Sequence, residues 1–396
     1  MGLNPQSILL GLIVLAGNTR LFVFSLYTYE LPISVRLVAS IILLICQIFV
    51  RNFKNTQNRN GTLHALFLFL LLFLVFSSSY SRQTHYSERG FSNIFELMDF
   101  LELFFVLNAI YFSLNNLLKN QLEGVLTVSF VVSALYLLIS YSTTKGLSAD
   151  LGSGTQFRTL GASRTYATAI LGLTFFIRST NIIKYLSIGF LLIGIMHGGS
   201  RATLLALITS IFTVYLLALM IKKSNFKSRF YLILQIVLLS TIILYFFQTT
   251  SVYLTFFVDT TPDSSFYYAS RDTMIWVSLE QFKMSPIFGL GYGSFVFVED
   301  LDVVYPHNLL LSIIVDIGLV GLFTVFCIFV VTFKNLNLLQ SVRHVEGRFL
   351  IALFLFSLIS SIFYGSYFDH TLLYLALFGI KTLSRDYTAM RSSGII

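Results

Sequence analysis

The stretch "VVYPHNLLLSIIVDIGLVG" (residues 303–321) places Pro306, His307 and Asn308 directly before a mostly apolar run that contains one aspartate and two glycines. Apolar runs of about 20 residues are typical of membrane-spanning helices, because lipid offers no partners for backbone N–H and C=O groups and a helix satisfies these groups internally. Similar runs rich in Leu, Ile and Phe recur along the chain. The pattern therefore predicts a membrane protein built from α-helices.

The composition agrees with this fold class. Of the 396 residues, 56% are hydrophobic and 11% are charged, whereas a soluble domain carries about 25% charged residues. We predict an all-α polytopic protein with about 12 transmembrane helices that form a single integral membrane domain over residues 1–396. The predicted spans cover roughly 7–27, 33–50, 62–78, 92–114, 122–141, 160–178, 182–197, 201–221, 229–247, 309–332, 347–364 and 367–384.

Charge predicts the orientation in the membrane. Basic residues gather in short cytoplasmic loops, and most of the 26 Lys and Arg residues fall on one side if both termini are cytoplasmic. The net charge of +8 is then a topology signal, and we expect no nucleic-acid partner. No basic region precedes the first apolar run, so we expect this span to be retained.

One connection is much longer than the others. Residues 248–308 form a predicted outward loop between spans 9 and 10, and long loops with their own secondary structure usually carry function. The piece "RDTMIWVSLEQF", which starts at Arg271, is typical of a short helix that Pro286 can end. Gly289, Gly291 and Gly293 allow backbone turns that a Cβ would forbid. These glycines serve either close packing, which we favour, or contact with a ligand.

Several residues at the outward ends of the predicted spans could carry chemistry. Arg201 opens the eighth span, Arg271 opens the loop helix and His307 opens the tenth span. Arginine offers bidentate hydrogen bonds to phosphate oxygens, and histidine is a natural general base for a sugar hydroxyl. The group predicts a site for a diphosphate substrate, in which Asn308 would orient either the histidine ring or the acceptor.

Arg158 and Arg164 open the sixth predicted span on the same side. Taken singly, each of these arginines is better explained as an anchor at the lipid headgroups, and only their joint arrangement favours a substrate site. No paired Cys and His spacing and no HExxH motif occurs, so the sequence indicates neither a metal nor another cofactor.

Three acids share one face of the fourth predicted span. Glu96, Asp99 and Glu102 follow each other at intervals of three residues. They predict either a proton or cation path or, as we favour, ion pairs with arginines of neighbouring spans. The candidate partners are Arg82, Arg89 and Arg164.

Residues 195–330 resemble the O-antigen ligases and the related O-antigen and exopolysaccharide polymerases, which are bacterial inner-membrane glycosyltransferases of the GT-C class. The ligase motif, His-(Asn/Ser/Gln)-x9-Gly-x2-(Gly/Thr/Val), is matched by His307, Asn308, Gly318 and Gly321. The stretch "SRDTMIWVSLEQFKMSPIFGLGYGSF" is similar to the family's arginine-containing helix and Pro-x-Phe-Gly-x-Gly turn. The stretch "GGSRATLLAL" is similar to the segment with the family's other essential arginine.

The resemblance implies transfer of a glycan from undecaprenyl diphosphate to a sugar hydroxyl at the periplasmic face, with inversion and without a metal. His307 would be the base, and Arg201 and Arg271 would hold the leaving diphosphate. Asn308, Arg164, Arg158 and Trp276 are the remaining predicted substrate-binding residues. The expected location is the bacterial inner membrane, with membrane lipid and other polysaccharide-assembly proteins as partners.

The acceptor distinguishes two enzymes within this family. A ligase transfers to a lipid A-core sugar, whereas a polymerase transfers to another lipid-linked repeat unit. The motif at 307–321 favours the ligase, although "YPHN" and "GLGYGSF" are also common in polymerases. A polysaccharide transporter or flippase is a third possibility, but the paired repeats with broken helices that many transporters show are not visible in the sequence.

Overall fold

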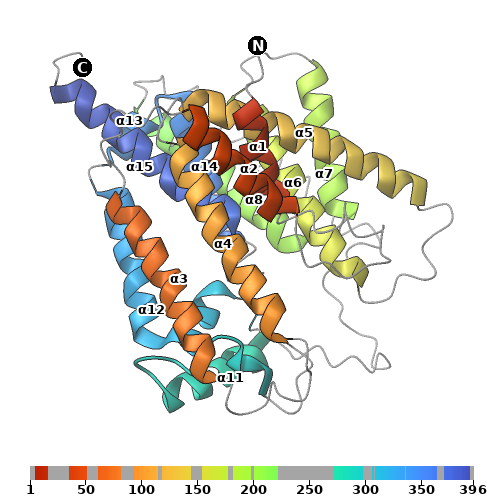
Figure 1. Ribbon diagram of the computed structural model, residues 1–396. Helices are drawn as coiled ribbons and strands as arrows, with labels where there is room; N and C mark the ends of the chain where they lie inside the picture. Colours follow the sequence, from red (N-terminus) through yellow and green to blue (C-terminus); the bar gives the residue numbers. More distant parts are fainter. Residues whose placement is uncertain are drawn as a thin grey trace. The chain divides into compact units, whose positions relative to one another are not determined.

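A computed structural model describes residues 5–16, 35–50, 61–81, 92–114, 118–143, 154–176, 182–197, 200–221, 271–297, 306, 308–334, 336–363 and 370–392. Within these residues every regular element is a helix (Figure 1). The helices before the loop are α1 (Pro5–Ala16), α2 (Val35–Val50), α3 (Gly61–Ser81), α4 (Ser92–Leu114), α5 (Leu118–Thr143), α6 (Gly154–Phe175), α7 (Ile182–His197) and α8 (Arg201–Ile221). The others are α11 (Arg271–Met284), η3 (Ser294–Phe297), α12 (Leu309–Phe333), α13 (Leu338–Ser341), α14 (Val345–Phe363) and α15 (Thr371–Ser392).

The helices agree with the membrane protein that the sequence predicts. Each predicted span coincides with or overlaps a described helix, except 229–247, which lies outside the described residues. By length and composition, three described stretches are able to cross a membrane, namely Ala202–Met220, Leu309–Phe333 and Val345–Phe363. The count of 12 spans and the outward position of the loop stay predictions.

Some helix ends differ from the prediction. α6 starts at Gly154, before the predicted 160, and α15 continues to Ser392, beyond the predicted 384. Apolar runs mark only the part of a helix that lies in lipid, and a helix continues past this layer where polar residues still form its backbone hydrogen bonds. Arg158 and Arg164 therefore lie inside α6 and do not open it.

The chain divides into two compact units. Unit 1 comprises Met1–Val128, Phe266–Leu336 and Leu358–Ile396, and unit 2 comprises Ser129–Ser265 and Asn337–Ser357. Each unit is described by itself below.

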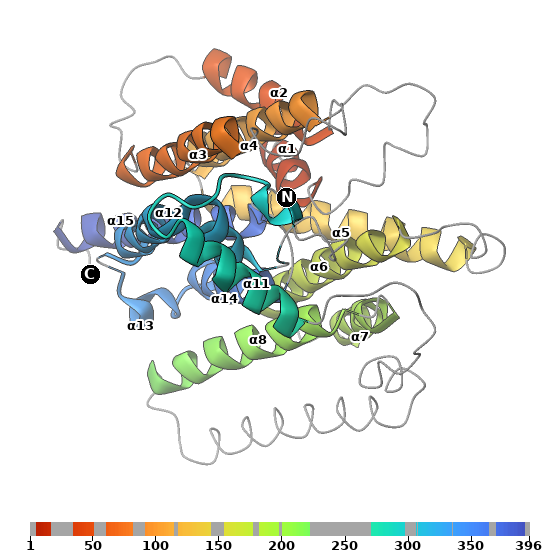
Figure 2. The ribbon, with the colours of Figure 1, turned by 90° about the horizontal axis from the view of Figure 1, so that it is seen from below.

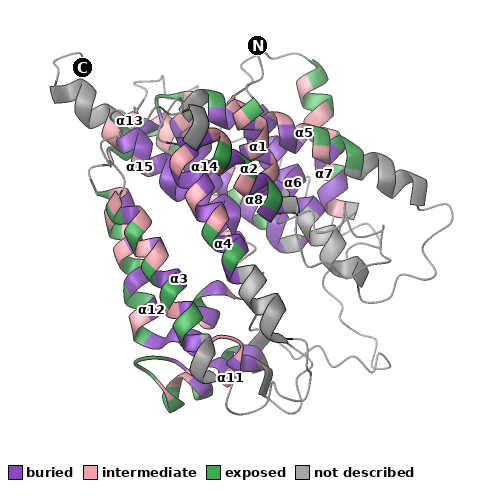
Figure 3. Ribbon diagram, in the orientation of Figure 1, coloured by how far each residue is buried: buried purple, intermediate pink, exposed green. Residues whose placement is uncertain are grey.

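The centre of unit 1 is formed by α15, whose residues 371–380 are all buried (Figure 3). It packs against α1, α4 and α12. Phe378 of α15 contacts the rings of Phe67 on α3 and Tyr111 on α4, and the Lys381 Nζ donates to the carbonyl oxygen of Val331 on α12 at 2.7 Å. These contacts hold α3, α4 and α12 around one helix.

A buried ion pair joins two further helices of unit 1. Arg36 of α2 pairs with Glu102 of α4, and both side chains are buried. This confirms that Glu102 pairs with an arginine of another predicted span, although the partner is none of the three that the sequence suggested. Sequence spacing reveals which acids share a helix face, but it does not reveal which helix packs against that face. The side chains of Glu96 and Asp99 lie outside the described residues.

In unit 2 the most enclosed helix is α6. Its residues 162–173 are nearly all buried and include many Ala, Ser, Thr and Gly residues, whose small side chains let neighbouring helices approach closely in a membrane. α6 packs against α7 and α8, and the rings of Phe175 and Tyr215 contact each other.

Candidate functional site

The site begins at the N-terminus of α12, where Asn308 is the N-cap residue. Its side-chain oxygen accepts hydrogen bonds from the backbone N–H groups of Leu310 at 2.9 Å and Leu311 at 3.2 Å. The first N–H groups of a helix have no partner within the helix, so an asparagine here satisfies two of them. This explains why a polar residue precedes the apolar run. The predicted role of Asn308 in substrate binding stays untested.

α12 is interrupted at Gly318. This residue has φ 60° and ψ −151°, which is not a helical conformation, and the helix is kinked there. In a continuous helix the N–H of Leu319 would donate to the carbonyl oxygen of Val315, and that of Val320 to Asp316. The kink separates these two pairs, so two N–H groups and two carbonyl groups need other partners.

The loop turn at residues 286–291 supplies all four partners. The N–H groups of Leu290 and Gly291 donate to the carbonyl oxygens of Val315 and Asp316 at 2.7 and 3.0 Å. The N–H of Leu319 donates to Pro286 O at 2.9 Å, and the N–H of Val320 donates to Ile287 O at 3.2 Å. We call these four hydrogen bonds the backbone clamp. Non-helical backbone at membrane depth is tolerated where protein satisfies its polar groups, and the clamp does this.

Two glycines make the clamp sterically possible. Gly289 has φ 74°, and a Cβ on it would lie 2.4 Å from the carbonyl carbon and oxygen of Asp316. A Cβ on Gly318 would lie 2.5 Å from the carbonyl oxygen of Ile287. The close neighbours are backbone atoms, which cannot move aside as a flexible side chain does. The expectation that the loop glycines serve turns and close packing is confirmed for Gly289.

Side chains fix α11 against the first half of α12. Met274 on α11, Phe295 on η3 and Val315 on α12 form a buried cluster, on which Val277 and Ile314 also pack. Viewed from below, α11 crosses α12 (Figure 2). The predicted loop helix is confirmed, and its first residue is Arg271, as expected.

The turn is also tied to α3 and α4. The N–H of Tyr292 donates to the Ser77 hydroxyl oxygen at 3.2 Å. The Tyr292 ring meets the ring of Phe100 edge to face, and the Phe288 ring stacks on Phe73. No sequence pattern indicates Ser77, because only the fold brings it close to a residue more than 200 positions away.

The predicted site residues are distributed over both units. Asn308 and Trp276 belong to unit 1, and the Trp276 side chain is exposed on α11. Arg271 is placed as the first residue of α11, while its side chain lies outside the described residues, as does all of His307. Unit 2 holds the other predicted residues, namely Arg158 and Arg164 on α6 and Arg201 at the start of α8.

The structure locates two of the arginines in unit 2, and Arg164 differs from the expected surface position. Arg164 is buried, ten residues after the start of α6 at Gly154. Arg201 is the first residue of α8, next to the buried Ser200, whose hydroxyl donates to Thr203 Oγ1 at 2.5 Å. The side chains of Arg158 and Arg201 lie outside the described residues.

Asp316 is a buried acid that the sequence analysis did not assign to the site. It lies in α12 beside the break, and its carbonyl oxygen belongs to the backbone clamp. An ionisable side chain within a span is costly and is usually retained for function. The signal was visible as the single charged residue in the apolar run after Asn308.

No group of three or more His, Cys, Asp and Glu side chains suited to a metal ion occurs among the described residues. The acids of the loop, from Asp259 to Asp263 and from Glu299 to Asp302, fall outside that part of the chain. The prediction of a metal-independent reaction is therefore not tested by the structure.

Comparison with known proteins identifies the central part of the chain. Residues 186–326 match the family model described as O-antigen ligase. No curated protein and no solved structure matches the chain. The matched region contains α8, α11, the turn at 286–291 and the break in α12, whereas Arg158 and Arg164 precede it. Residues 186–326 of this membrane protein are thus similar to the O-antigen ligases, as the resemblance of its motifs indicates.

Proposed function

We propose that the protein is an O-antigen ligase-type glycosyltransferase, which moves a glycan from undecaprenyl diphosphate to a hydroxyl of a lipid A-core sugar. The reaction takes place at the periplasmic face of the bacterial inner membrane, and both termini are cytoplasmic. The family match at 186–326 carries this proposal. The backbone clamp supports it, because it joins the two motifs of that region into one structural element.

In the proposed reaction, His307 removes the proton from the acceptor hydroxyl. The hydroxyl oxygen then attacks the anomeric carbon of the donor from the face opposite the phosphate. A new carbon–oxygen bond forms as the bond to the diphosphate breaks, so the configuration inverts and undecaprenyl diphosphate leaves. Arg271 and Arg201 neutralise the charge that develops on the leaving group.

The positions of these residues support the assigned roles. Arg271 starts α11, Arg201 starts α8, and His307 directly precedes the N-cap residue of α12. The N-terminus of a helix carries a partial positive charge, which favours a nearby phosphate. Asn308, Trp276, Arg158 and Arg164 complete the proposed substrate-binding residues.

A polymerase of the same superfamily is the second candidate. Two sequence motifs shared with polymerases favour it, namely "YPHN" at 305–308 and "GLGYGSF" at 289–295. Both enzymes use the same lipid-linked donor, and they differ in the acceptor.

Reconstitution with purified donor separates the two candidates. The protein is incubated in lipid vesicles with an undecaprenyl-diphosphate-linked glycan and with either lipid A-core or no further acceptor. A ligase gives a single glycan transfer that requires lipid A-core, whereas a polymerase gives a ladder of longer lipid-linked glycans without it.

The matched control for this assay is His307→Ala. Loss of a general base lowers a rate by about 10²–10⁴, so this variant should accumulate in the membrane at normal abundance and transfer almost no glycan. Near-normal transfer by His307→Ala would contradict the catalytic role. No product with either acceptor from the unmodified protein would contradict the proposed function.

A further inference from the structure

The loop segment that was predicted to be outside the membrane carries an exposed apolar surface. At the end of α11 and in the turn after it, the side chains of Met284, Ile287 and Phe288 are 74%, 55% and 56% exposed. On α11, Ile275, Trp276 and Leu279 are exposed as well. We call these six residues the loop apolar surface. Contiguous apolar surface of this kind on a soluble region marks an interaction site.

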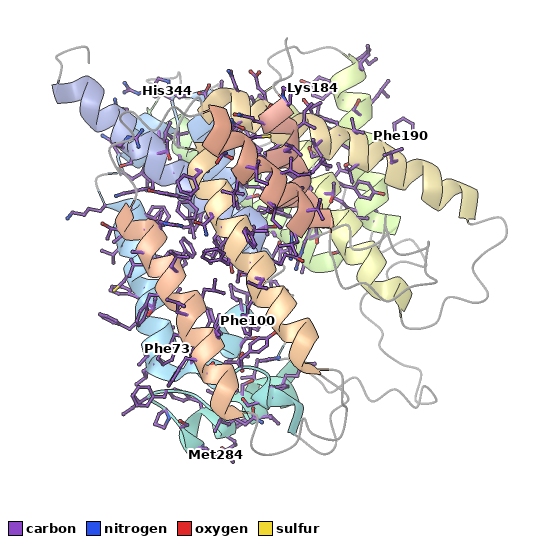
Figure 4. The ribbon with its side chains drawn as sticks, viewed as in Figure 1. Phe73, Phe100, Lys184, Phe190, Met284 and His344 are labelled. Carbon is purple, nitrogen blue, oxygen red and sulfur yellow. The ribbon has the colours of Figure 1, made fainter. Side chains whose placement is uncertain are left out.

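The contacts of the turn show its depth. The Phe288 ring is stacked on Phe73, with centroids 6.4 Å apart, and Phe73 lies inside the apolar run of α3, before its last large apolar residue, Phe76. The backbone clamp fastens the turn to residues 315–320, inside the stretch Leu309–Phe333 that is able to cross a membrane. Phe73 and Met284 lie toward the same end of unit 1 (Figure 4). Both neighbours of the turn therefore belong to apolar helix stretches.

α12, to which the turn is bonded, also carries exposed apolar side chains. Leu319, whose N–H donates to Pro286 O, is exposed. Farther along α12, the side chains of Leu322, Phe323, Phe326 and Val330 are exposed too. Exposed large apolar side chains along a spanning helix face lipid, so the surface of the turn extends a lipid-facing surface.

A charged pair lies on α11 between Trp276 and Met284. Lys283 and Glu280 on α11 form an exposed ion pair at 2.6 Å, about one to two turns after Trp276. Tryptophan concentrates where apolar chains meet headgroups, and lysine extends its charge toward the headgroups while its methylenes stay in apolar surroundings.

We propose that residues 276–291 are a re-entrant segment that dips into one leaflet of the bilayer. Met284, Ile287 and Phe288 contact acyl chains, while Trp276 and the ion pair of Glu280 and Lys283 lie at the headgroups. The partner of the loop apolar surface is thus membrane lipid. This inference is independent of the reaction that the protein catalyses.

The chain offers a direct probe, because Trp276 is its only tryptophan. The unmodified protein is placed in phosphatidylcholine vesicles whose acyl chains carry bromine either near the headgroup or near the chain end. Bromine near the headgroup should quench the fluorescence of Trp276 most strongly, and aqueous iodide should quench it several-fold less than it quenches N-acetyltryptophanamide in buffer.

A second probe reports on the turn. In the Trp276→Phe background, Phe288→Trp should be quenched by bromine deeper in the acyl chain than Trp276 is. Phe326→Trp in the same background is the matched reference for a residue on the lipid-facing side of a span. All three measurements are read without any substrate, so they are separate from the test of the glycosyltransferase.

The inference is overturned if iodide quenches Trp276 as strongly as the free reference compound and brominated lipid leaves it unaffected. The same result at position 288, together with normal lipid quenching at position 326, would place the turn in water. If Phe288→Trp does not fold, the measurement on the unmodified protein decides the question.

Discussion

Gly318→Ala tests whether the backbone clamp holds the loop in place. At φ 60° and ψ −151°, an alanine would occupy a region of conformational space that essentially only glycine adopts. Its Cβ would also lie 2.5 Å from Ile287 O and 2.7 Å from Gly289 N. We expect α12 to become a continuous helix, in which Leu319 and Val320 regain their ordinary helical acceptors, and the turn to detach.

The expected size of the effect follows from two contributions. The disfavoured backbone conformation costs about 1–3 kcal/mol in the docked form. Alanine favours the continuous helix over glycine by about 1 kcal/mol. Even before the steric clash is counted, the equilibrium shifts by about 2–4 kcal/mol toward the detached turn, which corresponds to about 30- to 900-fold.

Hydrogen exchange of the turn measures this shift. The N–H groups of Leu290 and Gly291 donate to α12, so their exchange should be slow in the unmodified protein. In Gly318→Ala it should be faster by a factor that approaches about 30- to 900-fold. Gly289→Ala should act in the same way, because its Cβ would meet the Asp316 carbonyl. Glycan transfer should be lost in both variants, while their abundance in the membrane is maintained.

Gly189→Ala is the matched control, because a Cβ added to this glycine of α7 meets no atom within 4 Å. It should leave both the exchange of the turn and glycan transfer unchanged. If Leu290 and Gly291 stay equally protected in Gly318→Ala, the clamp does not depend on the backbone conformation of Gly318, and the reasoning is refuted.

Three further predictions concern charge. Arg271→Lys and Arg201→Lys should both abolish transfer, because lysine keeps the positive charge but lacks the bidentate geometry of arginine; an active lysine variant would indicate simple anchoring at the headgroups. Transfer by the purified protein should survive EDTA, and a loss that Mg²⁺ or Mn²⁺ restores would disprove the arginine mechanism. Glu102→Ala should destabilise unit 1 by about 3–5 kcal/mol in denaturant unfolding, because it leaves Arg36 as a buried charge without its carboxylate. The stability of the double variant Arg36→Met and Glu102→Leu should be much closer to that of the unmodified protein. An equal loss of stability in both variants would contradict this account.

The sequence predicted the features that depend on local pattern. Apolar runs located the helices, and the piece after Arg271 was recognised as a short helix that ends before Pro286. The glycines of the turn were correctly predicted to allow unusual backbone turns, since glycine itself tolerates positive φ angles.

Features that depend on packing between distant segments could not be predicted in the same way. The residues around Gly318 do not indicate that the turn at 286–291 is its partner, and the residues around Glu102 do not indicate that it pairs with Arg36. The N-cap function of Asn308 was not predicted, because Asn308 was interpreted together with its neighbour His307 as part of the chemical site. The start of α6 was placed too late because hydropathy follows lipid contact and not helical hydrogen bonding.

The kink at Gly318 also has a consequence for how the chain is made. The turn at 286–291 leaves the ribosome before α12 does, and α12 then enters the membrane as an apolar segment. If α12 were already broken at Gly318, four of its backbone groups would be costly in lipid without the turn beside them. A continuous helix satisfies these groups from the start, so we expect α12 to insert straight. The break then arises afterwards, when two hydrogen bonds within α12 are exchanged for four with the returning turn.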